Sequence, residues 1–284
     1  MEFAPFVDLL GGEGAQAWEI LTESRLALDR GEDVIVLSIG DPDLETPGFV
    51  VDVAVDALRK GDTHYTELEG RHSLRASIAS KISHSAGVEI KPDWVTVLAG
   101  TQNAFYSACR CLFGDGDEVI VLDPAYVTYE ACIASTGAQQ VRVEQPAAAG
   151  FRPDIDAIER AVTSATRGIV FSNPSNPTGV ALNRDELEAI SRIAVSNDLW
   201  VVVDEVYSDL VFEGVHHSIA GLPGMLERTV TVSSVSKSYA MTGWRCGWAV
   251  GPPELGTHLR KMALINLYGL PGFVMEAADI ALRE

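Results

Sequence analysis

Lys237 lies in a setting that is unusual for a lysine. It follows the β-branched run 229–232 and is surrounded by small residues in Ser-Ser-Val-Ser-Lys-Ser-Tyr-Ala. The other four lysines lie in helical or loop contexts typical of a solvated surface. Burial lowers the pKa of an amine and frees it for Schiff-base chemistry with a carbonyl compound. The alternative interpretation is an internal ion pair with Asp204.

A carboxylate and an aromatic ring follow two other apolar runs. Asp204 comes directly after residues 200–203, at the mouth of a predicted buried strand, where an unpaired charge is costly and needs a cationic partner. Tyr126 follows residues 118–122 and could stack on a planar ring. The plainer alternatives are a helix N-cap for Asp204 and a packing side chain for Tyr126.

Three further segments could bind an anion or fix a polar side chain. Residues 99–103 open a predicted helix with Ala-Gly-Thr-Gln-Asn, and free N–H groups at a helix start attract phosphate, although an ordinary N-cap would look the same. Arg245, between Trp244 and Cys246, is in too apolar a setting for a surface charge, and its guanidinium suits a phosphate. Residues 173–179 contain two Asn-Pro pairs that either hold Asn176 in one orientation or form an ordinary turn.

The elements that must position these residues alternate between strand and helix. Short apolar runs occur at residues 94–98, 118–122, 140–143, 168–171, 200–203, 229–232 and 246–250, most of them separated by helix-length amphipathic stretches such as 185–196. Such strands favour an α/β fold with a mostly parallel sheet that is covered on both faces. The link between 232 and 246 is too short for a parallel crossover helix, so one strand is expected to run antiparallel. Ligands bind at the carboxyl ends of such strands, where the polar residues above converge.

Composition excludes several classes of protein. The 284 residues are 47% hydrophobic and 21% charged, which is typical of globular domains, and the net charge of −19 would repel a nucleic acid. No apolar stretch approaches the roughly 20 residues of a membrane helix, and the first residues lack the basic region of a signal peptide. The four cysteines show no zinc or disulfide spacing. We therefore predict a cytoplasmic protein with no metal site and no membrane or nucleic-acid partner.

The motifs taken together resemble a known family. Gly-Asp-Pro at 40–42, Asn-Pro-x-Asn-Pro-Thr-Gly at 173–179, Asp-Glu-Val-Tyr at 204–207 and Ser-x-Ser-Lys followed by Gly-Trp-Arg at 234–245 occur in this order. In these motifs, from Gly40 to about Gly251, the chain resembles the fold-type I class I/II aminotransferases, which depend on pyridoxal 5'-phosphate. The resemblance implies a three-layer α/β/α large domain with a mostly parallel seven-stranded sheet.

The resemblance also implies roles for single residues. Lys237 is similar to the lysine that carries the cofactor, Asp204 to the carboxylate that keeps the pyridine nitrogen protonated, and Tyr126 to the residue stacked on the ring. Asn176 and Tyr207 match the pair that binds the 3-oxygen of the ring. We expect the catalytic residues to be Lys237, Asp204 and Tyr207.

The phosphate and the substrate have their own expected residues. The phosphate set corresponds to Thr101, Gln102, Ser234, Ser236 and Arg245. Tyr65 matches a tyrosine that reaches the phosphate of the other subunit, which implies a homodimer. Gly40 and Asn176 are expected to contact the substrate.

The family pattern predicts how the chain is divided. Residues 1–45 would form an N-terminal arm and a segment of a small domain, and residues 46–284 the cofactor-binding large domain. In this family a small C-terminal domain supplies an arginine that binds the substrate α-carboxylate. The chain stops at Glu284 within a helical pattern, so we expect that domain to be missing, either because the sequence is a fragment or because the protein is a truncated product.

The implied reaction moves an amino group from an L-amino acid to a 2-oxo acid such as pyruvate, with ping-pong kinetics. Several segments, among them 12–20 and 238–248, are more similar to bacterial arginine:pyruvate transaminases than to aspartate or aromatic transaminases. A C-S lyase on the same scaffold and a non-catalytic remnant are the alternatives. Transcription regulators also carry such domains, but they add a basic helix-turn-helix segment, and the first 45 residues here are acidic.

Overall fold

A seven-stranded sheet forms the centre of the computed structural model, which describes all residues except 1, 2, 4 and 11. The strands lie in the order β1-β7-β6-β5-β4-β2-β3. Their bounds are Val95–Leu98 (β1), Glu118–Asp123 (β2), Gln139–Glu144 (β3), Thr166–Ser172 (β4), Trp200–Asp204 (β5), Thr229–Ser234 (β6) and Gly247–Val250 (β7). Strand β7 pairs antiparallel with β1 and β6, and the other pairs are parallel. The seven predicted strands and the predicted antiparallel strand are confirmed.

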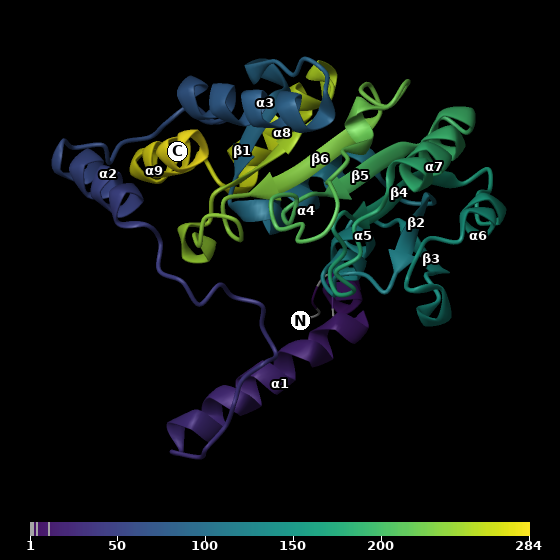
Figure 1. The fold of residues 1–284 in the computed structure, drawn as a ribbon, viewed down its shortest axis with the longest axis horizontal. Helices are drawn as coiled ribbons and strands as arrows, with labels where there is room; N and C mark the ends of the chain where they lie inside the picture. Colours follow the sequence, from purple (N-terminus) through teal and green to yellow (C-terminus); the bar gives the residue numbers. More distant parts are fainter. Residues whose placement is uncertain (1–2, 4, 11) are drawn as a thin grey trace.

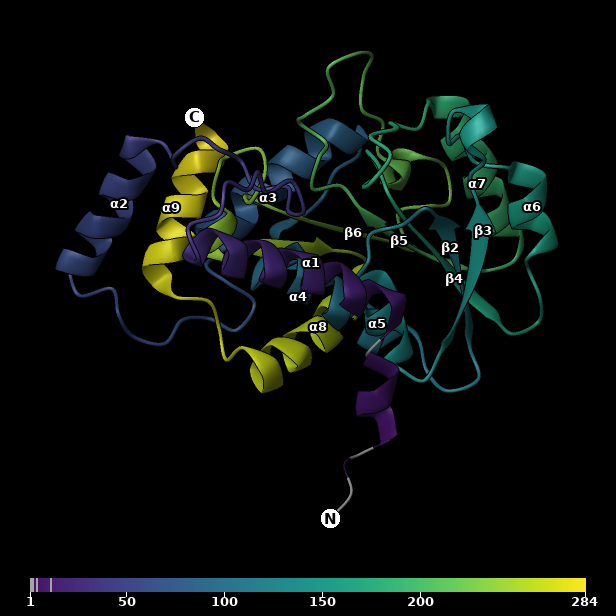
Figure 2. The same ribbon diagram turned by 90° about the horizontal axis from the view of Figure 1, so that it is seen from below.

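Helices cover both faces of this sheet (Figure 1, Figure 2). Their bounds are Gly12–Asp29 (α1), Gly48–Arg59 (α2), His72–Ala86 (α3), Gly100–Leu112 (α4), Tyr129–Ala134 (α5), Ile155–Arg160 (α6), Arg184–Ser196 (α7), Pro253–Asn266 (α8) and Gly272–Arg283 (α9). Helices α4, α5 and α8 share one core with the sheet. Helices α6 and α7 pack on the opposite face, and α2, α3 and α9 pack near β1 and β7. The fold has the expected three α/β/α layers.

The alternation of side chains along β2 explains why helices cover both faces of the sheet. Val119 and Val121 point into the core with α4, whereas Ile120 and Leu122 point into the core with α7, and all four are buried. A strand of this kind can lie only between two apolar layers. Helix α7 begins at Arg184, after the N-cap Asn183, whose side chain forms a capping box with Glu186; this start is close to the predicted start at residue 185.

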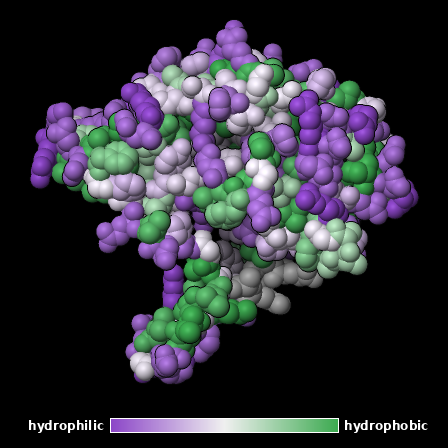
Figure 3. All heavy atoms as spheres, viewed as in Figure 1, coloured by the Kyte–Doolittle hydropathy of each residue, from purple (hydrophilic) through white to green (hydrophobic). Residues whose placement is uncertain are grey.

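The N-terminal helix α1 projects from the body of the molecule (Figure 1). Ile20, Leu26 and Leu28 on α1 are exposed, and Figure 3 shows hydrophobic side chains gathered on this projection. The extended segment after α1 also exposes Ile35 and Leu37. Residues 1, 2, 4 and 11 of the predicted arm lie outside the described residues. Within the described part of the chain, no helix has the length and apolar character needed to cross a membrane.

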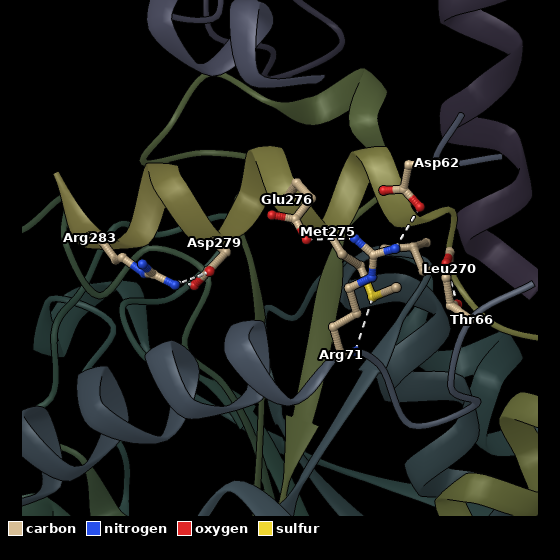
Figure 4. A network of polar contacts seen from close by, with 8 residues as sticks. All are labelled: Asp62, Thr66, Arg71, Leu270, Met275, Glu276, Asp279 and Arg283. Atoms are coloured by element: carbon tan, nitrogen blue, oxygen red, sulfur yellow. Dashed lines mark hydrogen bonds and ion pairs between the residues drawn. The ribbon is translucent and has the colours of Figure 1, made fainter. Parts of the chain in front are cut away.

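A polar network joins the loop after α2 to helix α9 (Figure 4). The Arg71 guanidinium donates to Asp62 and to Glu276, each at 2.5 Å. The Thr66 hydroxyl donates to the Leu270 carbonyl at 2.8 Å. Because these contacts flank Tyr65, they fix the loop that carries this residue.

Candidate active site

A cavity of about 500 Å³ opens at the carboxyl ends of the central strands. The ends of β5 and β6, the start of α4 and the segment 38–41 contribute to its wall. The predicted site residues that line it are Gly40, Thr101, Gln102, Tyr126, Asn176, Asp204, Tyr207, Ser234, Ser236, Lys237 and Arg245. Residues that are separated by up to about 200 positions in the sequence thus meet around one space, as expected for this type of sheet.

Asp204 is buried at the end of β5. Its Oδ1 accepts a hydrogen bond from the Val206 N–H at 3.0 Å, and its Oδ2 accepts one from the Tyr129 hydroxyl at 2.9 Å. Burial raises the pKa of Asp204 to about 6, and the two hydrogen bonds oppose that rise. The expected cationic partner is replaced by these two donors, so the carboxylate is stabilised by hydrogen bonds.

Tyr129 is a site residue that the sequence reasoning missed. It is fully buried, its ring stacks on Phe105 with centroids 4.3 Å apart, and it lies edge-on to Tyr126. The signal was its spacing of three residues from Tyr126, next to the start of α5. Burial raises the pKa of the Tyr129 phenol well above its usual value, so the hydroxyl remains a donor.

Lys237 follows β6 and is half-buried. Its ammonium group donates a hydrogen bond to the Gly40 carbonyl instead of forming the alternative ion pair with Asp204. Burial lowers the pKa of Lys237, as predicted, with a smaller lowering effect from Arg245. A larger fraction of this amine is therefore neutral than of an exposed lysine.

Several residues of the predicted phosphate set line the cavity where α4 begins. Gly100 adopts φ +82°, a conformation that strains any other residue, and a Cβ there would lie 2.5 Å from Nη2 of Arg245, whose side chain would have to move. The Thr101 hydroxyl oxygen is buried and has no hydrogen-bond partner among the described residues. Ser234 and Ser236 are both buried beside it on the cavity wall. The first N–H groups of a helix have no partner within the helix, so those at the start of α4 are available to a bound anion.

One member of the predicted phosphate set, Arg245, differs from expectation in its exposure. The Arg245 side chain is exposed, whereas its apolar sequence neighbours predicted burial. The chain turns at Arg245 with φ +54°, and this turn directs the guanidinium to the Ala99 and Thr242 carbonyls at the rim of the cavity while Cys246 enters the core. The amide oxygen of Gln102 accepts a hydrogen bond from the Thr128 hydroxyl at 2.7 Å, and its amide nitrogen donates one to the Cys132 sulfur at 3.2 Å.

The predicted aromatic and amide residues line the same cavity. The Asn176 amide donates to the Tyr207 hydroxyl at 3.3 Å, so the two residues lie as the predicted pair. Burial raises the pKa of both Tyr126 and Tyr207. Trp18 and Asp41 also line the cavity; both lie in segments that carry the family resemblance, but neither was predicted as a site residue. The Thr242 hydroxyl donates to Asp41 at 2.7 Å.

Tyr65 does not join this cavity. Its side chain is 86% exposed, its ring lies 5.0 Å from that of Tyr268, and both border a second hollow of about 500 Å³. The cavity around Lys237 therefore receives no group from Tyr65 of the same chain.

The cavity fits pyridoxal phosphate. An amine with a lowered pKa, an unpartnered buried hydroxyl at a helix start, an arginine and a buried carboxylate line one space. The phosphate needs the donors at the start of α4, and the pyridinium nitrogen needs the carboxylate.

Comparison with known proteins agrees with this geometry. A family model for aminotransferase class I and II matches residues 32–284. An arginine–pyruvate transaminase of Pseudomonas aeruginosa is 44% identical over all of this chain and 72% of its own length. An aspartate aminotransferase of Pyrococcus abyssi is 38% identical over 89% of this chain and 66% of its own length. The chain therefore spans about two thirds to three quarters of these relatives.

A solved structure gives the same result. The aspartate aminotransferase from Thermus thermophilus with maleate superposes with a TM-score of 0.95 and 32% identity, over 99% of this chain and 73% of that chain. The family model and the relatives cover enough of the sequence to assign it: this chain belongs to the aminotransferase class I and II family, whose members transfer amino groups with pyridoxal phosphate.

Proposed function

We propose that the cavity around Lys237 is an aminotransferase site that moves an amino group between an L-amino acid and a 2-oxo acid. The observation that carries the proposal is that the Lys237 amine and the Asp204 carboxylate line one cavity without forming an ion pair with each other. Each group is thus left to serve a bound molecule. We also propose that residues 46–284 form the cofactor-binding large domain and residues 1–45 an N-terminal arm and a segment of a small domain.

The proposed cofactor residues fall into three groups. Thr101, Gln102, Ser234, Ser236 and Arg245 would hold the phosphate, Tyr126 the ring face, and Asn176 with Tyr207 the ring oxygen. When bound, pyridoxal phosphate supplies an aldehyde that condenses with amines and a ring that withdraws electrons from the adjacent carbon.

Lys237 and Asp204 would then act on protons. The Lys237 amine, once free, takes the α-proton of the substrate because its lowered pKa favours the neutral form. Asp204 has a pKa of about 6, so its carboxylate is ionised above neutral pH and can hold a proton on the ring nitrogen. Tyr129 keeps that carboxylate oriented.

For the substrate pair we propose arginine and pyruvate. The arginine–pyruvate transaminase of Pseudomonas aeruginosa shares 44% of its residues with this chain over the matched length. Asp41 adds an exposed carboxylate to the cavity wall, which suits a cationic side chain.

For the assembly we propose a homodimer in which Tyr65 serves the site of the partner. Tyr65 is exposed and its hollow is open, and Tyr is frequent in protein interfaces. The Arg71 network would hold Tyr65 in place for this contact.

The test is absorbance and single-turnover kinetics of the purified chain loaded with pyridoxal phosphate. We expect a band of covalently bound cofactor that is absent in Lys237→Ala, and production of the 2-oxo acid from arginine faster than from aspartate. An unchanged spectrum in Lys237→Ala would remove the central claim. Release of a thiol from a β-thio amino acid, without amino transfer, would instead establish the lyase.

A further inference from the structure

A second pair of titratable groups lies behind the cavity. Glu205 is 1% exposed, and its Oε2 lies 3.5 Å from Nε2 of His216, whose side chain is 8% exposed. Neither carboxylate oxygen of Glu205 and neither ring nitrogen of His216 has a hydrogen-bond partner among the described residues. The 3.5 Å contact therefore joins two side chains whose polar atoms have no hydrogen bond in the described part of the chain.

This pair closes a ring of contacts around the ends of β4 and β5. The carbonyl of His217, the next residue, accepts from the Asn173 amide at 3.0 Å. The Asn173 N–H donates to the Asp204 carbonyl at 2.9 Å. Asp204 is covalently joined to Glu205, so the ring links the carboxylate of the site to the loop that carries Asn176.

Charge balance makes the pair more than a packing contact. Asp204 and Glu205 are consecutive, and in an extended backbone their side chains point to opposite faces, so only Asp204 lines the cavity. Two buried carboxylates so close together repel each other, and the Glu205 charge contributes to the raised pKa of Asp204. An unpaired buried carboxylate is also costly in itself, whereas a protonated imidazole beside it cancels its charge.

We propose that Glu205 and His216 form a buried carboxylate–imidazolium pair that positions Asp204 and the Asn176 loop and cancels the negative charge next to Asp204. They are positioning residues, since neither lines the cavity. The proposal deepens the role proposed for Asp204 and rests on it.

Other groups also act on Asp204 and remain constant in the test. The titratable groups that face it are Tyr126, Tyr129, Tyr207 and Lys237. The hydroxyl groups of Ser233 and Ser218 belong to the surroundings of the pair: Ser233 donates to the Glu205 carbonyl at 3.4 Å, and Ser218 is buried two residues after His216.

The experiment measures the Asp204 titration in the chain freed of cofactor. Carbon-13 NMR of aspartate carboxyl carbons reports it, and the signal is assigned by its loss in Asp204→Asn. We expect Glu205→Gln to lower the pKa of Asp204 below about 6 and His216→Gln to raise it, each by roughly half to one pH unit. If the substitutions only loosened the structure, the pKa of Asp204 would shift in the same direction in both variants.

A double variant and two controls complete the design. In the Glu205→Gln background, His216→Gln is expected to change the pKa of Asp204 little, because no charge is left to cancel; the double variant also contains no unpaired buried charge and should fold. The neighbouring changes Glu213→Gln and His217→Gln should leave the titration unchanged. Equal shifts from His216→Gln in both backgrounds, or shifts of one sign in the two single variants, would overturn the proposal. The measurement needs no turnover, so its failure is distinct from failure of the aminotransferase assignment.

Discussion

Asp204 is held in an environment that favours its neutral form, although the proposed chemistry needs its charge. Burial raises its pKa from 3.8 to about 6. Between these two values the folded chain binds more protons than the unfolded chain, so stability falls as pH rises through this window. Above pH 6 the charged Asp204 carboxylate therefore destabilises the cofactor-free fold, although the proposed chemistry needs this charge.

Replacing Asp204 by Asn should separate the effect of this carboxylate on stability from its effect on turnover. In the cofactor-free chain at pH 8, Asp204→Asn should raise the free energy of unfolding by on the order of 2 kcal/mol, and the gain should vanish below pH 4. Urea denaturation at both pH values checks this result. In the loaded enzyme the same variant should lose turnover about a hundredfold while it keeps its cofactor. Near-normal turnover would show that Asp204 has only a structural role.

The hydrogen bond from Tyr129 should help to set the pKa of Asp204. The hydrogen bond from its hydroxyl favours the charged form of Asp204, so Tyr129→Phe should raise the pKa of Asp204 above about 6. The cofactor-free Asp204 carboxyl signal in NMR would report the shift. Tyr106→Phe, which changes a half-buried tyrosine on α4 outside the cavity wall, is the matched control. An unshifted titration in Tyr129→Phe would contradict the role given to this bond.

At the scale of elements, the sequence predicted the sheet well because the length and the apolar pattern of the strand-forming runs were both clear. Runs such as 200–203 are short, rich in β-branched residues and apolar throughout, which is typical of a strand buried on both faces. The site residues at the strand ends followed from the same reasoning, because a polar residue after such a run must lie at the sheet edge.

The remaining features depend on tertiary contacts that no local pattern encodes. The partner of Glu205 is eleven residues away in an irregular loop, and the donor to Asp204 comes from α5, seventy-five residues earlier. Its apolar neighbours predicted that Arg245 is buried. The backbone of Arg245 itself lies in the left-handed region, and this turn directs its side chain to the rim of the cavity. Trp18 enters the cavity wall through the placement of the whole of helix α1.

The contact between the Tyr65 loop and α9 gives a prediction at this scale. Arg71 is partly buried and bridges Asp62 and Glu276, so Arg71→Gln should destabilise the fold by about 1–3 kcal/mol, because charged hydrogen bonds are lost and Asp62 is left without its cation. Chemical denaturation measures the loss. Lys60→Gln, which breaks an ion pair on the exposed side of α2, should change little. Equal effects of the two changes would mean that the bridge adds nothing beyond a surface pair.

For the whole molecule, two surfaces are suited to contact with another protein. One is the projecting arm with its exposed Ile20, Ile35 and Leu37, and the other is the hollow around Tyr65 and Tyr268. Exposed apolar patches of this kind mark interaction faces. Light scattering after size exclusion should therefore give twice the 30.5 kDa mass of the chain.

The last prediction concerns which subunit Tyr65 serves. Tyr65→Ala and Lys237→Ala each damage one part of the proposed site, and the first should not disturb the fold because its side chain is exposed. If the two variants are mixed, denatured and refolded together, half of the dimers should contain one subunit of each kind. In a mixed dimer, the site with intact Lys237 receives Tyr65 from its partner, and the other site carries both defects.

Mixing should therefore restore about one quarter of the wild-type rate, because half of the dimers have one intact site out of two. The rate is measured as amino transfer at limiting pyridoxal phosphate, where loss of a phosphate contact has its largest effect. Refolding each variant alone controls for recovery of native protein. If Tyr65 served the site of its own chain, every site in the mixture would carry one defect and mixing would restore nothing. A monomer with full activity would likewise exclude the shared site, because the 86% exposed Tyr65 lies outside the cavity of its own chain.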